Sequence, residues 1–413
     1  MMSYRALSKL YYEDKETYRH VYETRFHSQD TIKMDFRIKG NQAFFVQNAD
    51  VSNTIFQILK TDKNISMLSS QLPSAALEQY KKRCLIDEIV LTNKIEGVFS
   101  TRREITSILS DLEKSVNEKT TRKRFWGLVN QYVKLIANKS VSLQNSEDIR
   151  QLYNELILAE VIEENPGNAP DGKLFRRDST SVNTSTEKEI HRGTYPESAI
   201  IEEVEKSLAF LNDVSIYSLY RILIFHYLLE YIHPFYDGNG RLGRYIVSAL
   251  LSKELDPLLA YRISYTILEN INLYYNAFKV CNDPHNLGDV TPFLLMMLNM
   301  VNTSSKKLEE ALINRKIRLT NYKQIIPTLP GGTKERTYNT YLYLIQAGLF
   351  SENGISTRGL ECYLSNSYTT IKKELEFIDS YHLLTKTRVG KENYYLIDLE
   401  KLDYIILSKN TST

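Results

Sequence analysis

The stretch that decides the fold runs from His233 to Arg244 and reads His-Pro-Phe-Tyr-Asp-Gly-Asn-Gly-Arg-Leu-Gly-Arg. Its middle, residues 237–240, is a strong turn signal, because Gly and Asn tolerate the positive φ that tight turns require. The residues that follow, up to Leu251, carry apolar side chains at helical spacing. Residues 233–244, called the motif below, are therefore predicted to form a loop that enters a helix.

The start of a helix is a favourable place for a phosphate. Its first N–H groups lack partners within the helix, and the helix dipole makes this end positive. Three residues of the motif are expected to offer such N–H groups: Gly238, Asn239 and Gly240. Four more add two guanidinium groups, a carboxylate and an imidazole: Arg241, Arg244, Asp237 and His233. The residues alone thus predict a site for phosphate chemistry.

The composition narrows the class of protein. The chain has 413 residues, of which 42% are hydrophobic and 25% charged, with a net charge of +2, so no global field marks a nucleic-acid or membrane binder. Three cysteines lie far apart without a C-x-x-C spacing, which argues against a disulfide framework or zinc site and fits a reducing compartment. The first residues lack a signal peptide's apolar core, and no run approaches the ~20 apolar residues of a membrane span. We expect a cytoplasmic protein with no membrane contact.

Helical periodicity dominates the chain before residue 326. The stretches that show it are 74–138, 148–163, 197–212, 215–231, 260–282 and 291–325. A short hairpin is predicted around Gly40-Asn41, and the Pro-, Gly- and Ser-rich stretch 164–187 is predicted to be a loop. The fold class is therefore mainly α.

A Pro- and Gly-rich break at 326–333 precedes a different pattern. Three short helices are predicted and then two strands, at residues 335–348, 356–364, 367–381, 383–388 and 393–398. This order resembles a winged helix, whose third helix would read DNA. Residues 335–413 carry nine basic and ten acidic residues, a net charge of −1, whereas a DNA binder concentrates positive charge. A packing or dimerisation module is favoured, and DNA binding stays open.

The motif resembles the signature of the Fic family, H-P-F-x-[D/E]-G-N-G-R-x-x-R, and it fills every specified position. The resemblance implies a helical Fic core with a short β-hairpin flap, followed here by the small α+β winged-helix-like domain. The predicted domains are an amino-terminal helical region at 1–140, the Fic core at 141–325 and the winged-helix-like domain at 333–413. The implied activity is transfer of AMP from ATP to a Ser, Thr or Tyr hydroxyl of a protein, itself included, with Mg²⁺ as cofactor. A homodimer is also implied.

The family roles can be carried onto the motif residue by residue. His233 would accept the proton of the incoming hydroxyl, because imidazole titrates near neutral pH. Asp237 would be the magnesium ligand, as a hard oxygen donor beside phosphates. The α- and β-phosphates would be held by backbone N–H groups of Gly238, Asn239 and Gly240. Arg241 would contact phosphate oxygens, and Arg244 would reach the γ-phosphate. His226, on an apolar helix, is interpreted as a core residue.

Two further segments resemble parts of the family's binding site. The stretch that contains Tyr275 and Asn282 resembles the lining of the adenine pocket, which makes both residues candidate nucleoside contacts. Residues 187–193 resemble the flap that registers the target's backbone by strand addition, a role that would fall to Ile190, His191, Arg192 and Gly193. A plain surface hairpin is the alternative for this stretch.

Residues 92–97, Thr-Asn-Lys-Ile-Glu-Gly, match the [S/T]-x-x-x-E-[G/N] motif of the family's inhibitory helix, which we place at about 85–97. In that arrangement Glu96 would pair with Arg244 and take it away from the γ-phosphate. Such a pair at ~4 Å has about 4 kcal/mol of gross Coulomb energy before desolvation, enough to misalign ATP.

Two alternatives to an autoinhibited AMP transferase stay open. One is the reverse reaction, in which Glu96 helps a water remove AMP from a modified protein. The other is a DNA-binding regulator whose Fic core acts as a sensor. Transfer of the terminal phosphate is disfavoured, because relatives that do so depart from the motif at the position that Gly238 fills.

Overall fold

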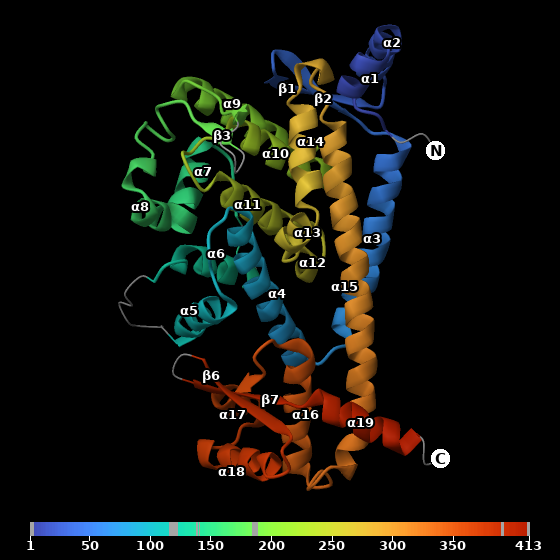
Figure 1. Ribbon diagram of the computed structural model, residues 1–413, viewed down its shortest axis with the longest axis vertical. Coiled ribbons are helices and arrows are strands. Elements are labelled where there is room, and N and C mark those ends of the chain that lie inside the picture. The colour runs from blue at the N-terminus through green and yellow to red at the C-terminus, as the bar shows by residue number, and fades with distance from the viewer. Residues whose placement is uncertain are drawn as a thin grey trace. The chain divides into compact units, whose positions relative to one another are not determined.

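The computed structural model describes residues 4–114, 123–137, 139, 141–183, 189–389 and 392–410. Helices dominate these residues, and the strands are confined to three small sheets (Figure 1). The predicted mainly α class is confirmed. Among the described residues, no helix combines the length and the apolar character needed to cross a membrane.

The chain divides into two compact units. The first comprises Met1–Asp62, Glu88–Ser100 and Leu112–Ser305, and the second comprises Lys63–Asp87, Thr101–Asp111 and Lys306–Thr413. Three long helices contribute residues to both units: α3 (Ala49–Ser70), α4 (Ser74–Ile95) and α15 (Thr291–Ile325). The domain limits expected from the sequence follow the chain in order and stay predictions.

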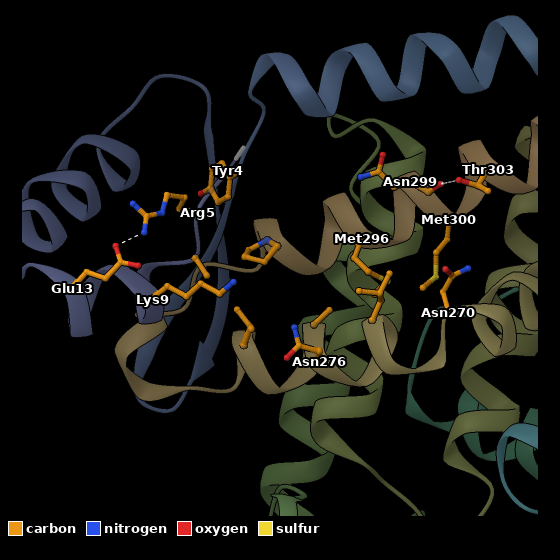
Figure 2. Close-up of a pocket in the computed structure, with 15 residues that line it drawn as sticks. Tyr4, Arg5, Lys9, Glu13, Asn270, Asn276, Met296, Asn299, Met300 and Thr303 are labelled. Carbon is orange, nitrogen blue, oxygen red and sulfur yellow. Dashed lines mark hydrogen bonds and ion pairs between the residues drawn. The ribbon is translucent and has the colours of Figure 1, made fainter. Parts of the chain in front are cut away.

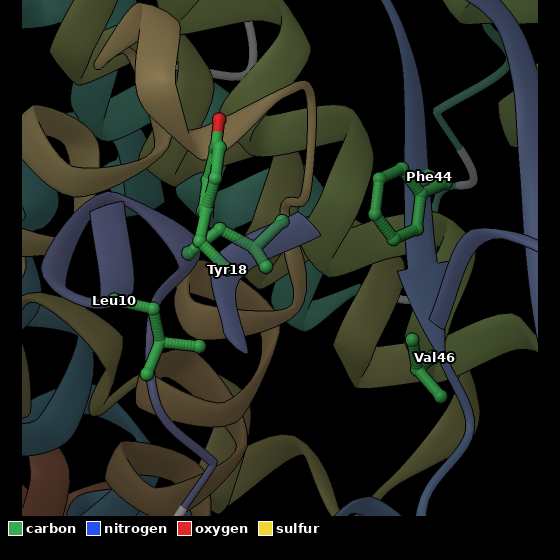
Figure 3. Close-up of a cluster of buried hydrophobic side chains, with 5 residues drawn as sticks. Leu10, Tyr18, Phe44 and Val46 are labelled. Atoms are coloured by element: carbon green, nitrogen blue, oxygen red, sulfur yellow. The ribbon is translucent and has the colours of Figure 1, made fainter. Parts of the chain in front are cut away.

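The first unit begins with two helices that the sequence did not predict, α1 (Leu7–Glu13) and α2 (Lys15–Phe26). They precede the predicted hairpin, which consists of the antiparallel strands β1 (Thr31–Ile38) and β2 (Asn41–Val46). The apolar residues of α1 and α2 are too few for a clear period, and burial against the hairpin stabilises them instead. The shared core consists of Leu7, Leu10, Tyr18, Phe44 and Val46 (Figure 3).

Helix α10 (Ser218–Ile232) leads into the motif and is apolar on all sides, which is typical of a central helix. It packs against α9 (Glu197–Asn212) and against α11 (Asn239–Glu254), the helix that follows the motif loop. Three shorter helices complete this part of the chain: α12 (Pro257–Ala260), α13 (Ile263–Glu269) and α14 (Ile271–Cys281). The helices predicted on both sides of the motif are confirmed.

The segment before the flap contains α6 (Trp126–Ile136), α7 (Ser146–Tyr153) and α8 (Ala159–Glu164). A π-helical turn, η1 (Asn154–Leu158), joins α7 to α8, so the helix predicted at 148–163 is present but interrupted. The stretch predicted to be a loop holds a short 3₁₀ turn, η2 (Pro166–Asn168), and the strand β3 (Ser181–Asn183). Strand β3 pairs antiparallel with β4 (Glu189–Arg192).

The second unit contains most of α5 (Arg102–Lys114), parts of the three long helices and the carboxy-terminal elements. The 3₁₀ turn η4 (Ile326–Thr328) marks the predicted break. The elements after it are α16 (Glu335–Phe350), β5 (Ile355–Ser356), α17 (Thr357–Leu364), α18 (Tyr368–Asp379), β6 (Leu384–Val389), β7 (Glu392–Ile397) and α19 (Leu399–Asn410). The strands form an antiparallel sheet in the order β5-β7-β6. All three predicted helices and both strands are present, whereas the two-residue β5 and helix α19 were not predicted.

Candidate active site

The motif begins where α10 ends. His233 is the C-cap of this helix and adopts the left-handed conformation, with φ 52° and ψ 63°. This conformation is unfavourable for a residue with a Cβ, by about 1–3 kcal/mol, so its surroundings must hold it. The backbone N–H of His233 donates to the Leu229 carbonyl (2.9 Å), and its own carbonyl accepts from Arg176 Nε (2.9 Å).

The side chain of Asn239 closes the motif loop. Its Oδ1 accepts from the Phe235 N–H (3.0 Å), and its Nδ2 donates to the Phe235 carbonyl (2.9 Å). The Phe235 ring is anchored by stacking on Tyr153, with 3.6 Å between ring centroids and 6° between planes. Asn239 therefore shapes the turn with its side chain, and its backbone N–H is the group left for an anion.

Two glycines of the motif occupy positions that do not suit a side chain. Gly238 is the N-cap of α11 at φ 81°, where a side chain would be strained. At Gly240, an added Cβ would overlap the Glu96 carboxylate and lie 2.9 Å from Arg244 Nη1. The Glu96 carboxylate thus lies against the backbone that was predicted to hold phosphate.

Arg241 is fully buried and forms an ion pair with Glu160. Its Nε and Nη2 have no hydrogen-bond partner, and neither does Glu160 Oε2. Unsatisfied buried donors are unfavourable, so this guanidinium suits an anion that arrives from outside. Burial raises the pKa of Glu160 in spite of the arginine. Glu160 could not be predicted from the sequence, where it is one acidic residue in a helical stretch far from the motif.

Arg244 and Glu96 meet as predicted. The distance from Arg244 Nη2 to Glu96 Oε1 is 2.7 Å, and the arginine side chain is 1% exposed. Thr92 accepts from the same guanidinium, through Oγ1 to Nε (2.8 Å) and through its carbonyl to Nη2 (3.1 Å). Burial acts to lower the pKa of Arg244, but Glu96, Tyr274 and Glu230 together outweigh burial, so the pKa of Arg244 is raised. The predicted helix needs one correction, because α4 begins earlier than expected and ends at Ile95, so Glu96 lies just after it.

Asp237 lies at the accessible edge of the motif, with a side chain 37% exposed. Its Oδ1 accepts from the Gly238 N–H (2.5 Å) and lies 3.9 Å from Arg241 Nη2. Among the described residues, no group of three or more His, Cys, Asp or Glu side chains is arranged to hold a metal on its own. A single carboxylate fits Mg²⁺ that takes its other ligands from phosphates and water.

His233 shares one face of α10 with two buried groups, because His226, Glu230 and His233 are spaced by four and three residues. Glu230 Oε2 lies 4.0 Å from His233 Nδ1, and Glu230 Oε1 has no hydrogen-bond partner. Burial, reinforced by Glu96, raises the pKa of Glu230 to about 8. His226 Nε2 is 2.8 Å from the Tyr274 hydroxyl, and burial lowers the pKa of His226 to about 3. Glu230 was not predicted from the sequence, where its signal is an acidic residue in a mainly apolar helix.

The pKa of His233 is lowered to about 4, mainly by burial and further by His191 and Arg176. The imidazole is therefore neutral near pH 7. A neutral imidazole can accept a proton, which is the state that a general base requires.

The two candidate nucleoside contacts lie seven residues apart, on α14 and its C-cap, and so on one face. Tyr275 is 43% exposed, whereas Asn282 is 9% exposed. The Tyr227 hydroxyl donates to Asn282 Oδ1 (2.7 Å), which leaves the amide nitrogen as the group that can face a base.

The flap residues form a hairpin end. His191 pairs with Val182 and Arg192 with Ser181, and the Gly193 N–H donates to the Thr180 carbonyl (3.1 Å). Residues 184–188, which include the start of the predicted extended stretch, lie outside the described residues, as does the side chain of Ile190. His191 is buried and its Nε2 lies 2.6 Å from the Tyr231 carbonyl, whereas Arg192 is exposed.

A separate cavity of about 640 Å³ lies between α1, α14 and α15 and contains no residue of the motif (Figure 2). Its lining includes Ala277, Met296 and Met300, as well as Arg5, which pairs with Glu13. Nothing in this cavity indicates the chemistry of a ligand.

Residues 143–251 match the model of the Fic/DOC family. These residues therefore form a Fic/DOC domain. It is similar to the protein adenylyltransferase Fic of Drosophila ananassae, with 26% identity over 230 residues that cover 54% of this chain and 41% of that protein. It is also similar to the protein adenylyltransferase fic-1 of Caenorhabditis elegans, with 32% identity over 98 residues, 23% of this chain and 18% of that protein. The matches thus span less than half of these relatives.

The fold of the chain is also similar to a solved structure. A Fic family protein from Desulfovibrio desulfuricans matches with a TM-score of 0.51 and 19% identity, covering 85% of this chain and 96% of that one. At this identity the likeness concerns the fold. The matched family residues include the flap strands, the motif and most of α11.

Proposed function

We propose that this protein is an autoinhibited AMP transferase that modifies a hydroxyl of a protein. One observation carries the proposal: Glu96 forms an ion pair with Arg244 and lies against Gly240, and both of these partners belong to a complete Fic motif. A carboxylate in this position competes with a phosphate for both the guanidinium and the backbone N–H groups. The relatives named protein adenylyltransferase support the same reaction class.

The residues of the motif account for the chemistry. His233 accepts the proton of a Ser, Thr or Tyr hydroxyl, and the oxygen forms a bond to the α-phosphorus of ATP as the bond to the pyrophosphate oxygen breaks. The unpaired donors of Arg241 and the first N–H groups of α11 bind the phosphates. Asp237 would hold Mg²⁺ together with the phosphates, and the cation would neutralise charge on the leaving pyrophosphate.

The inhibited state follows from the same contacts. With Glu96 in place, the Arg244 guanidinium is already engaged by Glu96 and Thr92, so it does not bind the γ-phosphate. The Glu96 carboxylate also repels phosphate over Gly240. ATP would then bind displaced, with its α-phosphorus out of line with the incoming hydroxyl.

Replacing Glu96 tests the proposal. Wild type, Glu96→Gly, His233→Ala and the double variant are incubated with labelled ATP and Mg²⁺, and label on the protein itself is measured. Glu96→Gly should raise self-labelling at least tenfold, and His233→Ala should remove the gain. Lys94→Gly is the matched control, because Lys94 is an exposed residue in the last turn of α4, two residues before Glu96. Equal labelling of wild type and Glu96→Gly contradicts the proposed inhibition.

The reverse reaction is a second candidate, favoured by the exposure of Glu96. Its side chain is 31% exposed, so water reaches the carboxylate beside the phosphate site. The same carboxylate that blocks one pose of ATP can orient a water towards an AMP-modified protein. Release of AMP from pre-modified protein, lost in Glu96→Gly, would identify this activity.

A further inference from the structure

The end of α10 is tied to the base of the flap. The last carbonyls of a helix lack partners within it. Here four successive carbonyls accept from residues outside the helix: those of Tyr231, Ile232, His233 and Pro234. Arg176 donates from Nε to His233 (2.9 Å) and from its backbone N–H to Pro234 (3.2 Å), and the Thr194 N–H donates to Ile232 (3.0 Å). His191 Nε2 completes the set at Tyr231, 2.6 Å away.

Arg176 is the centre of this connection. Its guanidinium is fully buried and donates to the carbonyls of Asp178 (2.6 Å), Thr194 (2.7 Å) and His233 (2.9 Å). Among the described residues, none of these partners is a carboxylate. Burial of a cation without an acid is unfavourable and lowers the pKa of Arg176. A neutral side chain would donate to the same carbonyls with less desolvation, so the charge itself requires an explanation.

We propose that Arg176 is a positioning residue for His233: its hydrogen bonds hold the histidine's left-handed backbone against the flap. The inference rests on the proposed function, since it assigns His233 the role of base. The packing supports it, because the flap passes directly over the histidine. A Cβ added at Gly193 would lie 2.5 Å from Arg176 Nη2 and 3.0 Å from both His233 Cβ and the Ile232 carbonyl oxygen.

Arg176 is one of several charged groups that affect the pKa of the His233 imidazole. Burial lowers the pKa of His233 first, and His191 and Arg176 lower it further, while Glu96 opposes them. Glu230, on the same helix as the histidine, faces Nδ1 at 4.0 Å. Because Arg176 contributes positive charge, its removal should raise the pKa of His233.

The kinetic test uses Arg176→Gln and Arg176→Lys in the Glu96→Gly protein. Gln is neutral and still donates hydrogen bonds, whereas Lys keeps the charge without the planar fork. We expect Arg176→Gln to lower kcat about 100-fold, with KM for ATP within about twofold, because misplacing a reacting group by ~1 Å has this effect. The acid limb of its pH profile should move to higher pH. Arg176→Lys should restore the acid limb but not the full kcat.

Arg150→Gln is the matched control, because Arg150 also donates to a carbonyl before the flap, that of Leu174 (2.6 Å), without contacting His233. The titration of His233 is followed by NMR, with its signal assigned by comparison with His233→Ala. A higher pKa of His233 in Arg176→Gln only, together with the loss of kcat, supports the proposal. Equal kcat and titration in the Gln variants at Arg176 and Arg150 overturn it. A shifted titration in a protein that transfers no AMP refutes the proposed function instead.

Discussion

The motif and the carboxy-terminal elements from α16 to α19, called the module below, differ in how they place charged side chains. In the motif, Arg241 and Arg244 are 0% and 1% exposed, and each is paired with an acidic side chain from outside the motif, Glu160 or Glu96. In the module, the pair of Lys372 and Glu376 on α18 is 57% and 63% exposed, with 3.7 Å between the charged atoms. Buried charges are unfavourable unless something binds them, whereas exposed pairs contribute little. The comparison indicates a ligand site in the motif and a solvated surface on α18.

Removing a buried cation of the motif should therefore have the largest effect. We expect Arg244→Met in the Glu96→Gly protein to lower AMP transfer by about 10²–10³-fold, because a preorganised donor at the phosphates is lost. Labelled ATP and the protein itself serve as substrates. Lys253→Met is the control, since Lys253 is an exposed cation on the same helix. Transfer at the parent's rate in Arg244→Met would remove the assigned role of this arginine.

The same comparison explains what could be predicted from the sequence. The turn and helix of the motif depend on Gly238 and on local apolar spacing, and both are readable in one short stretch. Glu96, the proposed inhibitory residue, could be found because it belongs to a second local pattern. Glu160, Arg176 and Glu230 were missed because their importance comes from burial beside residues brought together by folding. Helices α1 and α2 were missed for a related reason, since packing against the hairpin stabilises them.

Replacing Glu230 should have the second-largest effect, and it should change the free energy of unfolding rather than the rate of AMP transfer. Its folded-state pKa is raised to about 8 from 4.5, so the unfolded chain releases the proton more readily. Its contribution to stability is complete below pH 4.5 and is lost as the pH rises through about 8. Glu230→Gln keeps the neutral form and should be more stable than wild type by on the order of 4 kcal/mol at pH 8.

The prediction for Glu230 is checked by denaturant unfolding of both proteins at pH 4.5, 6 and 8. The difference between the two should grow with pH and nearly vanish at pH 4.5. Glu361→Gln is the control, because Glu361 lies in α17, is partly exposed and shows no such burial. A Glu230→Gln protein with a constant offset at all three pH values would contradict the buried, protonated carboxyl.

The smallest effect is expected in the module. Lys372→Ala should change the free energy of unfolding by less than about 0.5 kcal/mol, because the exposed pair with Glu376 is screened by solvent. If α18 reads DNA instead, the same substitution should weaken binding to a duplex and reduce the dependence of binding on salt by about one counterion. Titrating the full chain with labelled duplex at several salt concentrations distinguishes the two cases. Suppose that DNA affinity falls steeply with salt concentration and that Lys372→Ala weakens it. Then α18 would bind a ligand through exposed charges, and the contrast with the buried charges of the motif would no longer hold.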